Sequence, residues 1–580
     1  MSENTRRDRA EPTDAAEENA TADETAGEAT RFAVDPVTRV SGGGGQALRA
    51  QLDHEAGTVL DSQCRVTLFR GYEDVLEGRD ARDAVDLASR VCGDTGVVHS
   101  LAASMAVEMA ASAPPPPLAI HIRNMGQGAA FLYNLAGHLF LRAGPDYSAA
   151  MLSKTNPGLL ERAEATSALR ADAHGYETVG GVMAALDPVT GDLYDETLRR
   201  ARDVQKLVSL ALGKFPHPST AAPGGVTTTL DKTVLTQYFE HLKNLADFAK
   251  KVPAVWDDVL DFALEHHEGF ADVGRRPADL FTVGAWDAPG AYDARYENAD
   301  EWGRRRLSPP GVVVDGKLRT TDLHAVDRGI EEFVDRSRYD DWTGGEKRFE
   351  STPAGGAIAV RHPWNKTTRP APEADADTWA TAPRWDRRAM ESGAIARQWV
   401  AARAGDLRHP LVESTGDGLT LSLPEVALPE ATFRWDVPDR INAAERLRAE
   451  AYNLVYAGIA CYEGLVETLS ALKDGENSVH EGFTVPPEGT HRGVGFRESG
   501  RGAVTHHVVV EGGRLDTYQI LTPSTWASSP TDPFGTPGPI ETATRNTPIL
   551  EPYDDVSSFS GVDLLRAVRS FDPCMVCAGH

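Results

Sequence analysis

The chain ends in Asp572-Pro573-Cys574-Met575-Val576-Cys577-Ala578-Gly579-His580, so two of its five cysteines lie within its last seven residues. At C-x-x-C spacing the intervening turn places both sulfurs on one side, where they can chelate one soft metal ion. The same spacing also fits a redox-active thiol pair, half of a zinc site, or two incidental cysteines in a flexible end. Other segments of the chain have to decide between these interpretations.

A second segment with potential ligands is Arg90-Val91-Cys92-Gly93-Asp94-Thr95-Gly96-Val97-Val98-His99, which follows Arg70-Gly71-Tyr72-Glu73. Taken alone, it fits a buried cysteine and a core histidine at the start of a helix. Glu73 taken alone fits an acidic residue at a helix N-terminus, where the helix dipole stabilises its charge.

The composition is strongly acidic. The 580 residues include 86 acidic and 59 basic side chains, which gives a net charge of -27. This charge argues against a nucleic-acid partner, because contacts to phosphates need a basic face. Five cysteines in 580 residues cannot form a disulfide scaffold, so we expect a reducing compartment.

The sequence contains no run of 18 or more apolar residues, so we expect no transmembrane segment. The pair Arg6-Arg7 is not followed by the apolar run that an export signal requires. We therefore predict a cytoplasmic chain, with any association with a membrane made through its partners.

The first 30 residues differ in composition from the rest. They carry nine acidic residues and almost no apolar ones, so they cannot bury enough surface to offset the entropy of ordering. We predict a disordered acidic tail over 1–30 and a single domain over 31–580.

Apolar residues recur at helical spacing over 83–110, 121–142, 195–213, 231–266 and 440–473. Strand-like runs occupy 34–40, 47–52, 64–69 and parts of 493–521. The middle of the chain, 275–430, is rich in proline, glycine and tryptophan, and is expected to form long irregular connections. We therefore predict an α+β fold that is mainly α, with a large helical bundle and small β elements near the N- and C-terminal ends.

Together the segments resemble the large subunit of nickel–iron (NiFe) hydrogenases, in the uptake-type branch. That family carries an R-x-C-G-x-C-x-x-x-H motif in its N-terminal part and a D-P-C-x-x-C-x-x-H motif at its C-terminus. The resemblance covers about 31–580, and its other matching segments are 35–40, 70–73, 78–83, 143–147, 217–219, 223–226, 310–316, 320–323, 361–365 and 522–526.

The resemblance implies a nickel–iron centre in which four cysteine thiolates bind nickel and the iron carries CO and cyanide ligands. Soft, polarizable sulfur suits nickel, and the metal stabilises the thiolate form. Carried over by position, Cys92 and Cys574 are terminal nickel ligands and Cys577 is a bridging ligand. The second bridging position falls on Thr95, whose hydroxyl is a hard donor and a poor bridge between two soft metals.

The resemblance also implies roles for residues around the metals. The implied catalytic residues are Arg501, Asp572 and Cys574. Arg501, whose fork can donate to a cyanide ligand or position dihydrogen, is also a cofactor-binding residue. Ser524, with Thr525 as its neighbour, resembles the hydroxyl that bonds another cyanide.

Glu73 and His580 resemble the ligands of a magnesium (or iron) ion, which ties the C-terminus into the core. Two other positions depart from the family. Ser41 stands where a glutamate collects the proton released when dihydrogen splits, and serine lacks a carboxylate to act as general base. Asn134 stands where the family has an aspartate in the helix near the site. Cys64 and Cys461 fall on no ligand position and are expected to be buried packing residues.

The implied function is the oxidation of H2 to protons and electrons, which pass to an iron–sulfur small subunit in a heterodimer or higher assembly. The chain has too few cysteines for clusters of its own, so any electron path needs that partner. Thr95 and Ser41 argue against unmodified catalysis. The alternative is therefore a divergent homologue that is not a hydrogenase, with an altered or absent metal centre, acting as a structural or electron-transfer subunit. A zinc-binding scaffold would leave the other matching segments unexplained.

Overall fold

The computed structural model describes residues 20–24, 30–38, 45–228, 230–340, 342, 347–405, 408–424, 431–553 and 558–580. Ser41 and most of the predicted acidic tail lie outside the described residues. Within that segment the structure differs from the prediction of disorder, because Ala20–Glu24 form a strand (β1) that pairs with Thr30–Val34 (β2). An edge strand needs only backbone hydrogen bonds to one neighbour, and acidic side chains do not prevent these.

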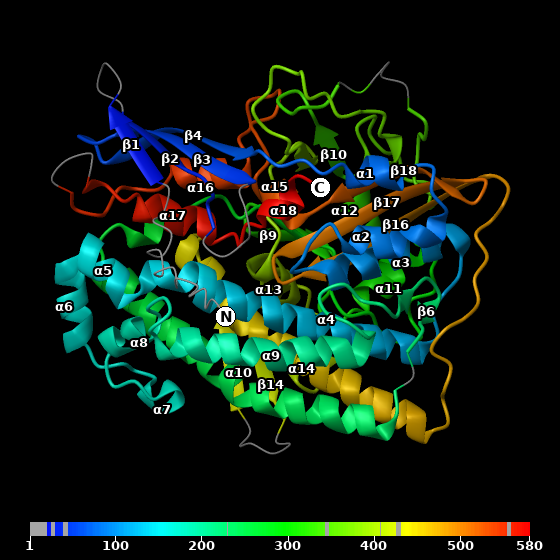
Figure 1. Ribbon diagram of the computed structural model, residues 1–580, viewed down its shortest axis with the longest axis horizontal. Coiled ribbons are helices and arrows are strands. Elements are labelled where there is room, and N and C mark those ends of the chain that lie inside the picture. Colours follow the sequence, from blue (N-terminus) through cyan, green and yellow to red (C-terminus); the bar gives the residue numbers. More distant parts are fainter. Residues whose placement is uncertain are drawn as a thin grey trace, which may run out of the picture.

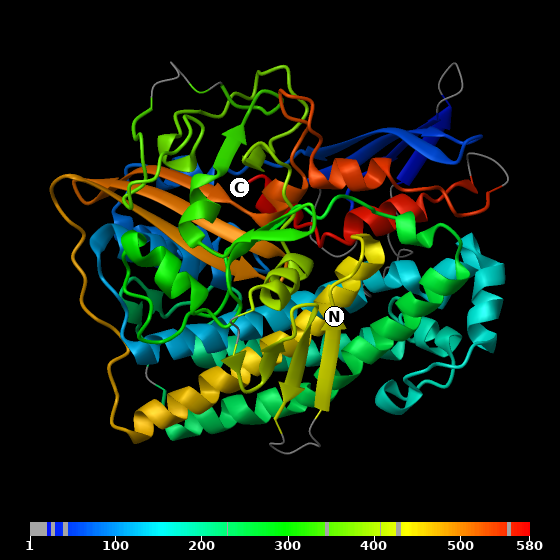
Figure 2. The same cartoon turned by 180° about the vertical axis from the view of Figure 1, so that it is seen from behind.

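Four long helices form the main layer and run side by side (Figures 1 and 2). They are α4 (Pro117–Gly137), α9 (Asp192–Leu212), α10 (Lys232–His266) and α14 (Ala443–Lys473). Helix α4 contacts α9 and α14, and α10 contacts the same two helices. In α9 the buried residues Val204, Leu207, Val208 and Ala211 recur every three or four positions, which is the pattern that predicted this helix.

Helix α3 (Gly96–Ala111) lies on a three-stranded antiparallel sheet of β16 (Thr490–Ser499), β17 (Gly502–Glu511) and β18 (Arg514–Leu521). The helix approaches the sheet closely at Gly495, where an added Cβ would lie 1.8 Å from the carbonyl oxygen of Ala102. Only glycine allows this distance. The close packing fixes the start of α3 relative to the turn Gly500–Arg501, which joins β16 to β17.

The two ends of the chain share a core. The first sheet has the strand order β1-β2-β3-β4, with β3 at Gln46–Asp53 and β4 at Thr58–Val66. Phe32 and Leu48 of this sheet pack with Ile540 and Leu564 of α16 (Pro539–Arg545) and α17 (Val562–Arg569). Figure 1 shows this sheet beside the two helices and the C-terminus inside the molecule.

The last helices complete the interior. Helix α15 (Pro523–Ala527) contacts α18 (Met575–Ala578), which leads to the buried C-terminal His580. A Cβ on Gly579 would lie 1.7 Å from the carbonyl oxygen of Leu68, so this step of the C-terminal segment requires glycine.

Smaller elements fill the remaining space. The shorter helices are α1 (Tyr72–Leu76), α2 (Ala84–Ser89), α5 (Ala149–Thr155), α6 (Pro157–Ala165), α7 (Ala171–His174), α8 (Val179–Ala185), α11 (Ala299–Arg304), α12 (Leu323–Arg328) and α13 (Ala394–Arg403). The shorter strands are β5 (Ala221–Ala222), β6 (Gly225–Val226), β7 (Leu280–Thr282), β8 (Gly311–Val314), β9 (Lys317–Thr320), β10 (Ile330–Phe333), β11 (Ala382–Trp385), β12 (Arg408–His409), β13 (Val412–Ser414), β14 (Gly418–Leu423) and β15 (Ala431–Asp436).

The α+β, mainly α class predicted from the sequence is confirmed, with the small sheets near both ends of the chain. Two expectations were incomplete. The region 275–430 contains short strands and α13, and most of these strands are too short to give a periodic signal. The helix expected over 83–110 is interrupted by a loop over 90–95, which carries Cys92.

Candidate metal centre

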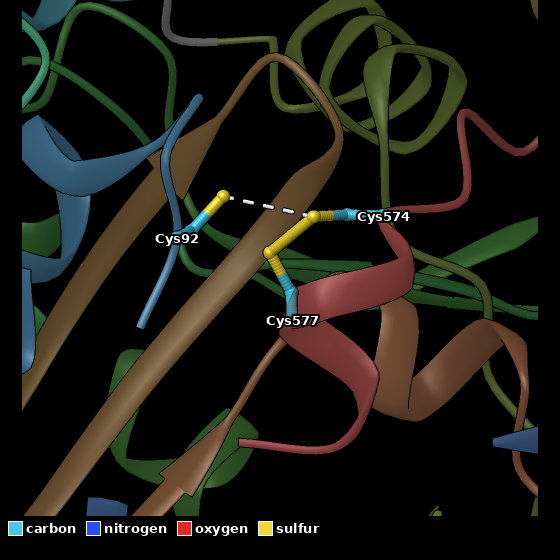
Figure 3. Close-up of side chains that lie close together, drawn as sticks. All are labelled: Cys92, Cys574 and Cys577. Atoms are coloured by element: carbon cyan, nitrogen blue, oxygen red, sulfur yellow. Dashed lines mark hydrogen bonds between the residues drawn. A yellow bond between two sulfur atoms is a disulfide. The ribbon is translucent and has the colours of Figure 1, made fainter. Parts of the chain in front are cut away.

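Three buried cysteines meet in the interior (Figure 3). Cys92 comes from the loop before α3, and Cys574 and Cys577 come from the C-terminal segment. The sulfurs of Cys92 and Cys574 are 3.6 Å apart, Cys574 and Cys577 form a disulfide, and the three sulfurs lie within 4.8 Å of one another. When the disulfide is reduced, three thiolates can bind at one metal site.

The start of α3 holds the fourth predicted ligand position close to these sulfurs. Thr95 is the N-cap residue of α3, is buried, and donates its backbone N–H to the sulfur of Cys92 at 3.2 Å. Burial and the nearby Asp94 raise the pKa of the Cys92 thiol, against the opposing charge of Arg501. A bound metal cation would favour the thiolate instead. The structure therefore brings three sulfurs together, with the backbone of Thr95 in contact with one of them.

Arg501 lies at the turn between β16 and β17 and is buried among carboxylates. Its Nε lies 3.3 Å from Oδ2 of Asp572, and its Nη2 donates to Oδ2 of Asp94 at 3.0 Å. Its third nitrogen, Nη1, is buried and has no hydrogen-bond partner among the residues that the structure describes. Burial disfavours the charged form, but Asp572 and Asp94 outweigh it and raise the pKa of Arg501. The orphaned Nη1 fits the predicted donation to a ligand of the metal centre.

Asp572 precedes the C-terminal cysteines in an uncommon backbone conformation, with a φ of 44°. Its carboxylate also lies 3.2 Å from Nη2 of Arg142, which is in the π-helical turn His138–Ala143 after α4. Burial raises the pKa of Asp572, but Arg142 and Arg501 outweigh it and lower the pKa. The carboxylate is thus held ionised between two guanidinium groups.

The two hydroxyl residues of α15 have different partners. The backbone N–H of Cys574 donates to the Ser524 hydroxyl at 2.9 Å, which leaves the hydroxyl hydrogen of Ser524 for another acceptor. The hydroxyls of Thr525 and Thr522 are 2.9 Å apart and form the capping box at the start of α15. The geometry therefore favours Ser524 over Thr525 as a ligand-binding hydroxyl.

Glu73 and His580, the predicted pair for a second metal ion, lie together. His580 Nε2 is 3.3 Å from Glu73 Oε1, and His580 Nδ1 donates to the carbonyl of Cys577 at 2.9 Å. Burial raises the pKa of Glu73, but Lys366, which contacts its Oε2, and His580 outweigh it and lower the pKa to about 2. A hydrogen bond from Nδ1 leaves Nε2 as the ring nitrogen available to a metal.

Three residues that the sequence did not single out complete this second pocket: Glu332, Lys366 and Gln519. Gln519 Nε2 donates to Glu332 at 2.9 Å, and its Oε1 is buried without a hydrogen-bond partner in the described part of the chain. Burial and the nearby Glu73 raise the pKa of Glu332 to about 7, although Lys366 opposes the shift. An orphaned carbonyl oxygen and two carboxylates beside His580 are hard donors of the kind that magnesium prefers.

The other expectations concern Cys64, Cys461 and Asn134. Both cysteines are buried and free, as expected for packing residues, and Cys461 fits against Gly128 of α4. Asn134 lies on α4 beside the site, where its Nδ2 donates to the backbone oxygen of Asp94 at 3.2 Å. Sequence reasoning missed Asp94 and Arg142, because their roles come from contacts between distant segments.

A second cluster of potential ligands consists of Asp327, His362 and His507. Tyr296 and His507 donate to the Asp327 carboxylate at 2.7 and 2.8 Å. His362 Nδ1 accepts the N–H of Trp364 at 3.3 Å, so its neutral ring carries the proton on Nε2, which faces Asp327. That nitrogen has no lone pair for a metal. We therefore interpret this cluster as a structural hydrogen-bond network.

The substitution Asp327→Asn is expected to lower the free energy of unfolding by about 2–4 kcal/mol at neutral pH, because the amide would turn a donor toward buried donors. The midpoint of urea unfolding measures this change. Burial alone would raise the pKa of Asp327, but His362 and His507 hold it well below its ordinary range.

A lowered pKa gives this contribution a definite pH dependence. It is present above the unfolded pKa of about 4 and is lost as the pH falls toward the folded pKa. The variant should therefore lose less stability than the original chain between pH values of about 7 and 3. An equal loss in both proteins would contradict the role of this carboxylate.

The three buried cysteines and the adjoining pocket of hard donors could hold metal ions, and a centre with sulfur ligands is of the kind that serves redox chemistry. A family model described as nickel-dependent hydrogenase matches residues 70–158 and 189–580. The chain therefore belongs to the nickel-dependent hydrogenase family, whose members are oxidoreductases that act on H2 at a nickel–iron centre.

Individual relatives agree with this assignment. The chain is 26% identical to the hydrogenase-1 large chain of Escherichia coli and 27% identical to the uptake hydrogenase large subunit of Bradyrhizobium diazoefficiens, each match covering 95% of both proteins. Among solved structures it is similar to the actinobacterial-type NiFe-hydrogenase from Ralstonia eutropha, with 37% identity and a TM-score of 0.91 over 95% of this chain and 100% of that chain. No helix within the described ranges is long and apolar enough to cross a membrane.

Proposed function

We propose that this chain is the large, catalytic subunit of an uptake-type hydrogenase, which oxidises H2 to protons and electrons. The observation that carries the proposal is the meeting of Cys92 with Cys574 and Cys577 near Arg501, whose Nη1 has no hydrogen-bond partner among the described residues. The family match supports the same reaction. We further propose a cytoplasmic location.

In this proposal Cys92 and Cys574 would bind nickel through their thiolates, and Cys577 would be a third thiolate ligand of the same nickel–iron centre. The centre, with CO and cyanide on its iron, supplies the site at which dihydrogen is split. The chain's own part is to keep three thiols in one buried group and to exclude water from it. The hydroxyl of Thr95 is a weaker fourth donor.

Arg501 positions the reactants in this proposal. Asp572 and Asp94 fix two of its nitrogens, so that Nη1 is left to donate to a cyanide ligand or to direct dihydrogen. Ser524 accepts the N–H of Cys574, and its hydroxyl hydrogen would be available to another cyanide. Asp572 is kept ionised by Arg142 and Arg501 and therefore acts as a fixed counter-charge.

We propose that magnesium binds between Glu73 and His580, with Glu332 and Gln519 close by. Because His580 is the last residue of the chain and Nδ1 holds the carbonyl of Cys577, an ion at this point would lock the C-terminal cysteines in place. Lys366 lies in contact with Glu73 and would share that carboxylate with the ion.

Electrons need a route out of the buried centre. Three of the five cysteines are assigned to the metals and the other two are far apart in sequence, so the chain has no set of thiols for an iron–sulfur cluster. We propose an iron–sulfur small subunit as the partner. The alternative, a divergent homologue with an altered or absent centre, is favoured by one observation, namely the hydroxyl of Thr95 at a ligand position.

Metal analysis and infrared spectroscopy of the purified protein separate these proposals. For the hydrogenase we expect nickel and iron in about equal amounts, together with infrared bands of metal-bound CO and cyanide. The absence of both metals and of these bands would overturn the hydrogenase proposal. Nickel without the CO and cyanide bands would favour the altered centre.

A further inference from the structure

Asp94 lies in the loop 90–95, called the ligand loop here because it carries Cys92, and its side chain contacts Arg501. It stands two positions after Cys92 and one before Thr95, and its Oδ2 accepts from Arg501 Nη2 at 3.0 Å. The same oxygen lies 3.6 Å from Nη1 of Arg142. The loop that supplies a thiol therefore also supplies a carboxylate to Arg501.

The second partner of Arg501 comes from the other end of the chain. Asp572 lies 3.3 Å from Arg501 and 3.2 Å from Arg142. Two carboxylates and two guanidinium groups thus alternate, and each arginine lies close to both carboxylates. This arrangement fixes the plane of Arg501 from two sides and leaves Nη1 as its unpaired nitrogen among the described residues.

Helix α4 passes the same place without a carboxylate. Asn134 contacts the site with an amide: its Nδ2 donates to the backbone oxygen of Asp94 at 3.2 Å, and its Oδ1 is buried without a partner in the described structure. A Cβ added to Gly500 would lie 3.0 Å from the Cβ of Asn134, so this position adjoins the Arg501 turn. The Asn134 amide thus holds the backbone of the Asp94 loop, while the Asp94 carboxylate provides the negative charge beside Arg501.

We propose that Asp94 is a positioning residue for Arg501, and that it supplies from the ligand loop the carboxylate that α4 lacks at Asn134. The inference rests on the proposed function, because the nitrogen that Asp94 orients is the one proposed to act on the metal centre. Since Asp94 and Cys92 share one short loop, the position of the arginine is tied to the position of the thiol.

Asp94→Asn removes the charge of the side chain but keeps its shape. Asp94→Glu keeps the charge on a side chain that is one methylene longer. The Asp94 side chain is 33% exposed, so the amide that replaces it would not be a fully buried polar group. In Asp94→Asn the turnover of H2 should fall about 10- to 100-fold through misplacement of Arg501, with an unchanged KM for H2 and unchanged nickel and iron contents. The infrared bands of cyanide should shift, because Nη1 of Arg501, the proposed donor to a cyanide ligand, has moved.

The decisive comparison is the double variant Asp94→Asn with Asn134→Asp. It places a carboxylate on α4 beside the Asp94 loop and the Arg501 turn, so it should recover at least about tenfold of the lost turnover and restore the cyanide bands. Asn134→Asp alone should instead lower turnover, because it adds a third carboxylate beside Asp94 and replaces the amide that donates to the Asp94 backbone oxygen. Asp86→Asn, at an exposed aspartate paired with Arg90, is the matched control and should change neither measurement.

The outcomes are distinct. Unchanged turnover and bands in Asp94→Asn would overturn the proposal, and so would a loss of nickel, which would assign Asp94 to holding the loop. A test without metals uses the thermal unfolding of the metal-free protein. Asp94→Asn and Arg501→Met together should lower the midpoint by less than the sum of the single losses. This coupling is expected even if the hydrogenase proposal fails, and additive losses would overturn the contact itself.

Discussion

The substitution Cys577→Ser is expected to lower the nickel content of the purified protein at least about 100-fold, with a parallel loss of H2 oxidation. Cys577 is buried and forms one group with Cys92 and Cys574. Among the described residues no further cysteine belongs to this group and could replace its sulfur. A serine hydroxyl is a hard donor and does not form a thiolate bridge between nickel and iron. Nickel and iron per protein, measured by mass spectrometry of the metals, check this result.

Cys461→Ser provides the matched control. Cys461 is also fully buried, and burial raises the pKa of its thiol to about 12, but among the described residues it does not belong to the group of sulfurs that could hold a metal. Its sulfur lies 3.8 Å from the carbonyl oxygen of Met125, to which a serine hydroxyl could donate. This variant should retain nickel. Equal metal loss in both variants would show that disturbance of the core, rather than loss of a ligand, explains the effect at Cys577.

The parts of the fold that the sequence predicted are those with regular local patterns. In α10 and α14 apolar residues recur over 35 and 31 residues, so the helical period is visible without knowledge of any neighbour. The division between α2 and α3 was not visible, because the apolar pattern continues through 90–95. The break follows from tertiary contacts there: Arg70 donates to the carbonyl of Arg90 at 3.3 Å and also to the carbonyl of Val91.

The candidate site shows the same limit. Cys92, Cys574, Cys577, Glu73 and His580 belong to segments that resemble motifs of the family, so the resemblance was enough to single them out. Asp94 stands at a variable position of its motif, and Arg142, Lys366 and Glu332 belong to no motif. Their positions depend on how α4, the connection before β11 and the C-terminal segment pack, and these contacts join residues hundreds of positions apart. Electrostatic partners of this kind become visible only in the folded chain.

The substitution Thr95→Cys is expected to raise H2-driven dye reduction at least about 100-fold, because it supplies the fourth thiolate of the proposed centre. The structure favours this exchange in two ways. Thr95 is buried within reach of Cys92, and cysteine needs no more space than threonine. Although Thr95 is the N-cap of α3, its hydroxyl makes no capping hydrogen bond within the described residues, so the helix loses no cap.

Thr95→Ser separates the effect of the thiol from that of a smaller side chain, because it keeps the hydroxyl and removes only a methyl group. It should match the original chain in metal content and rate, whereas Thr95→Cys should change the infrared bands of the centre together with the rate. If Thr95→Cys leaves both unchanged in protein that contains nickel and iron, residue 95 is not a ligand position. If Thr95→Cys binds more metal but gains no activity, the proton path is the remaining defect. Adding Ser41→Glu should then restore turnover, because a carboxylate can accept the proton that serine cannot hold.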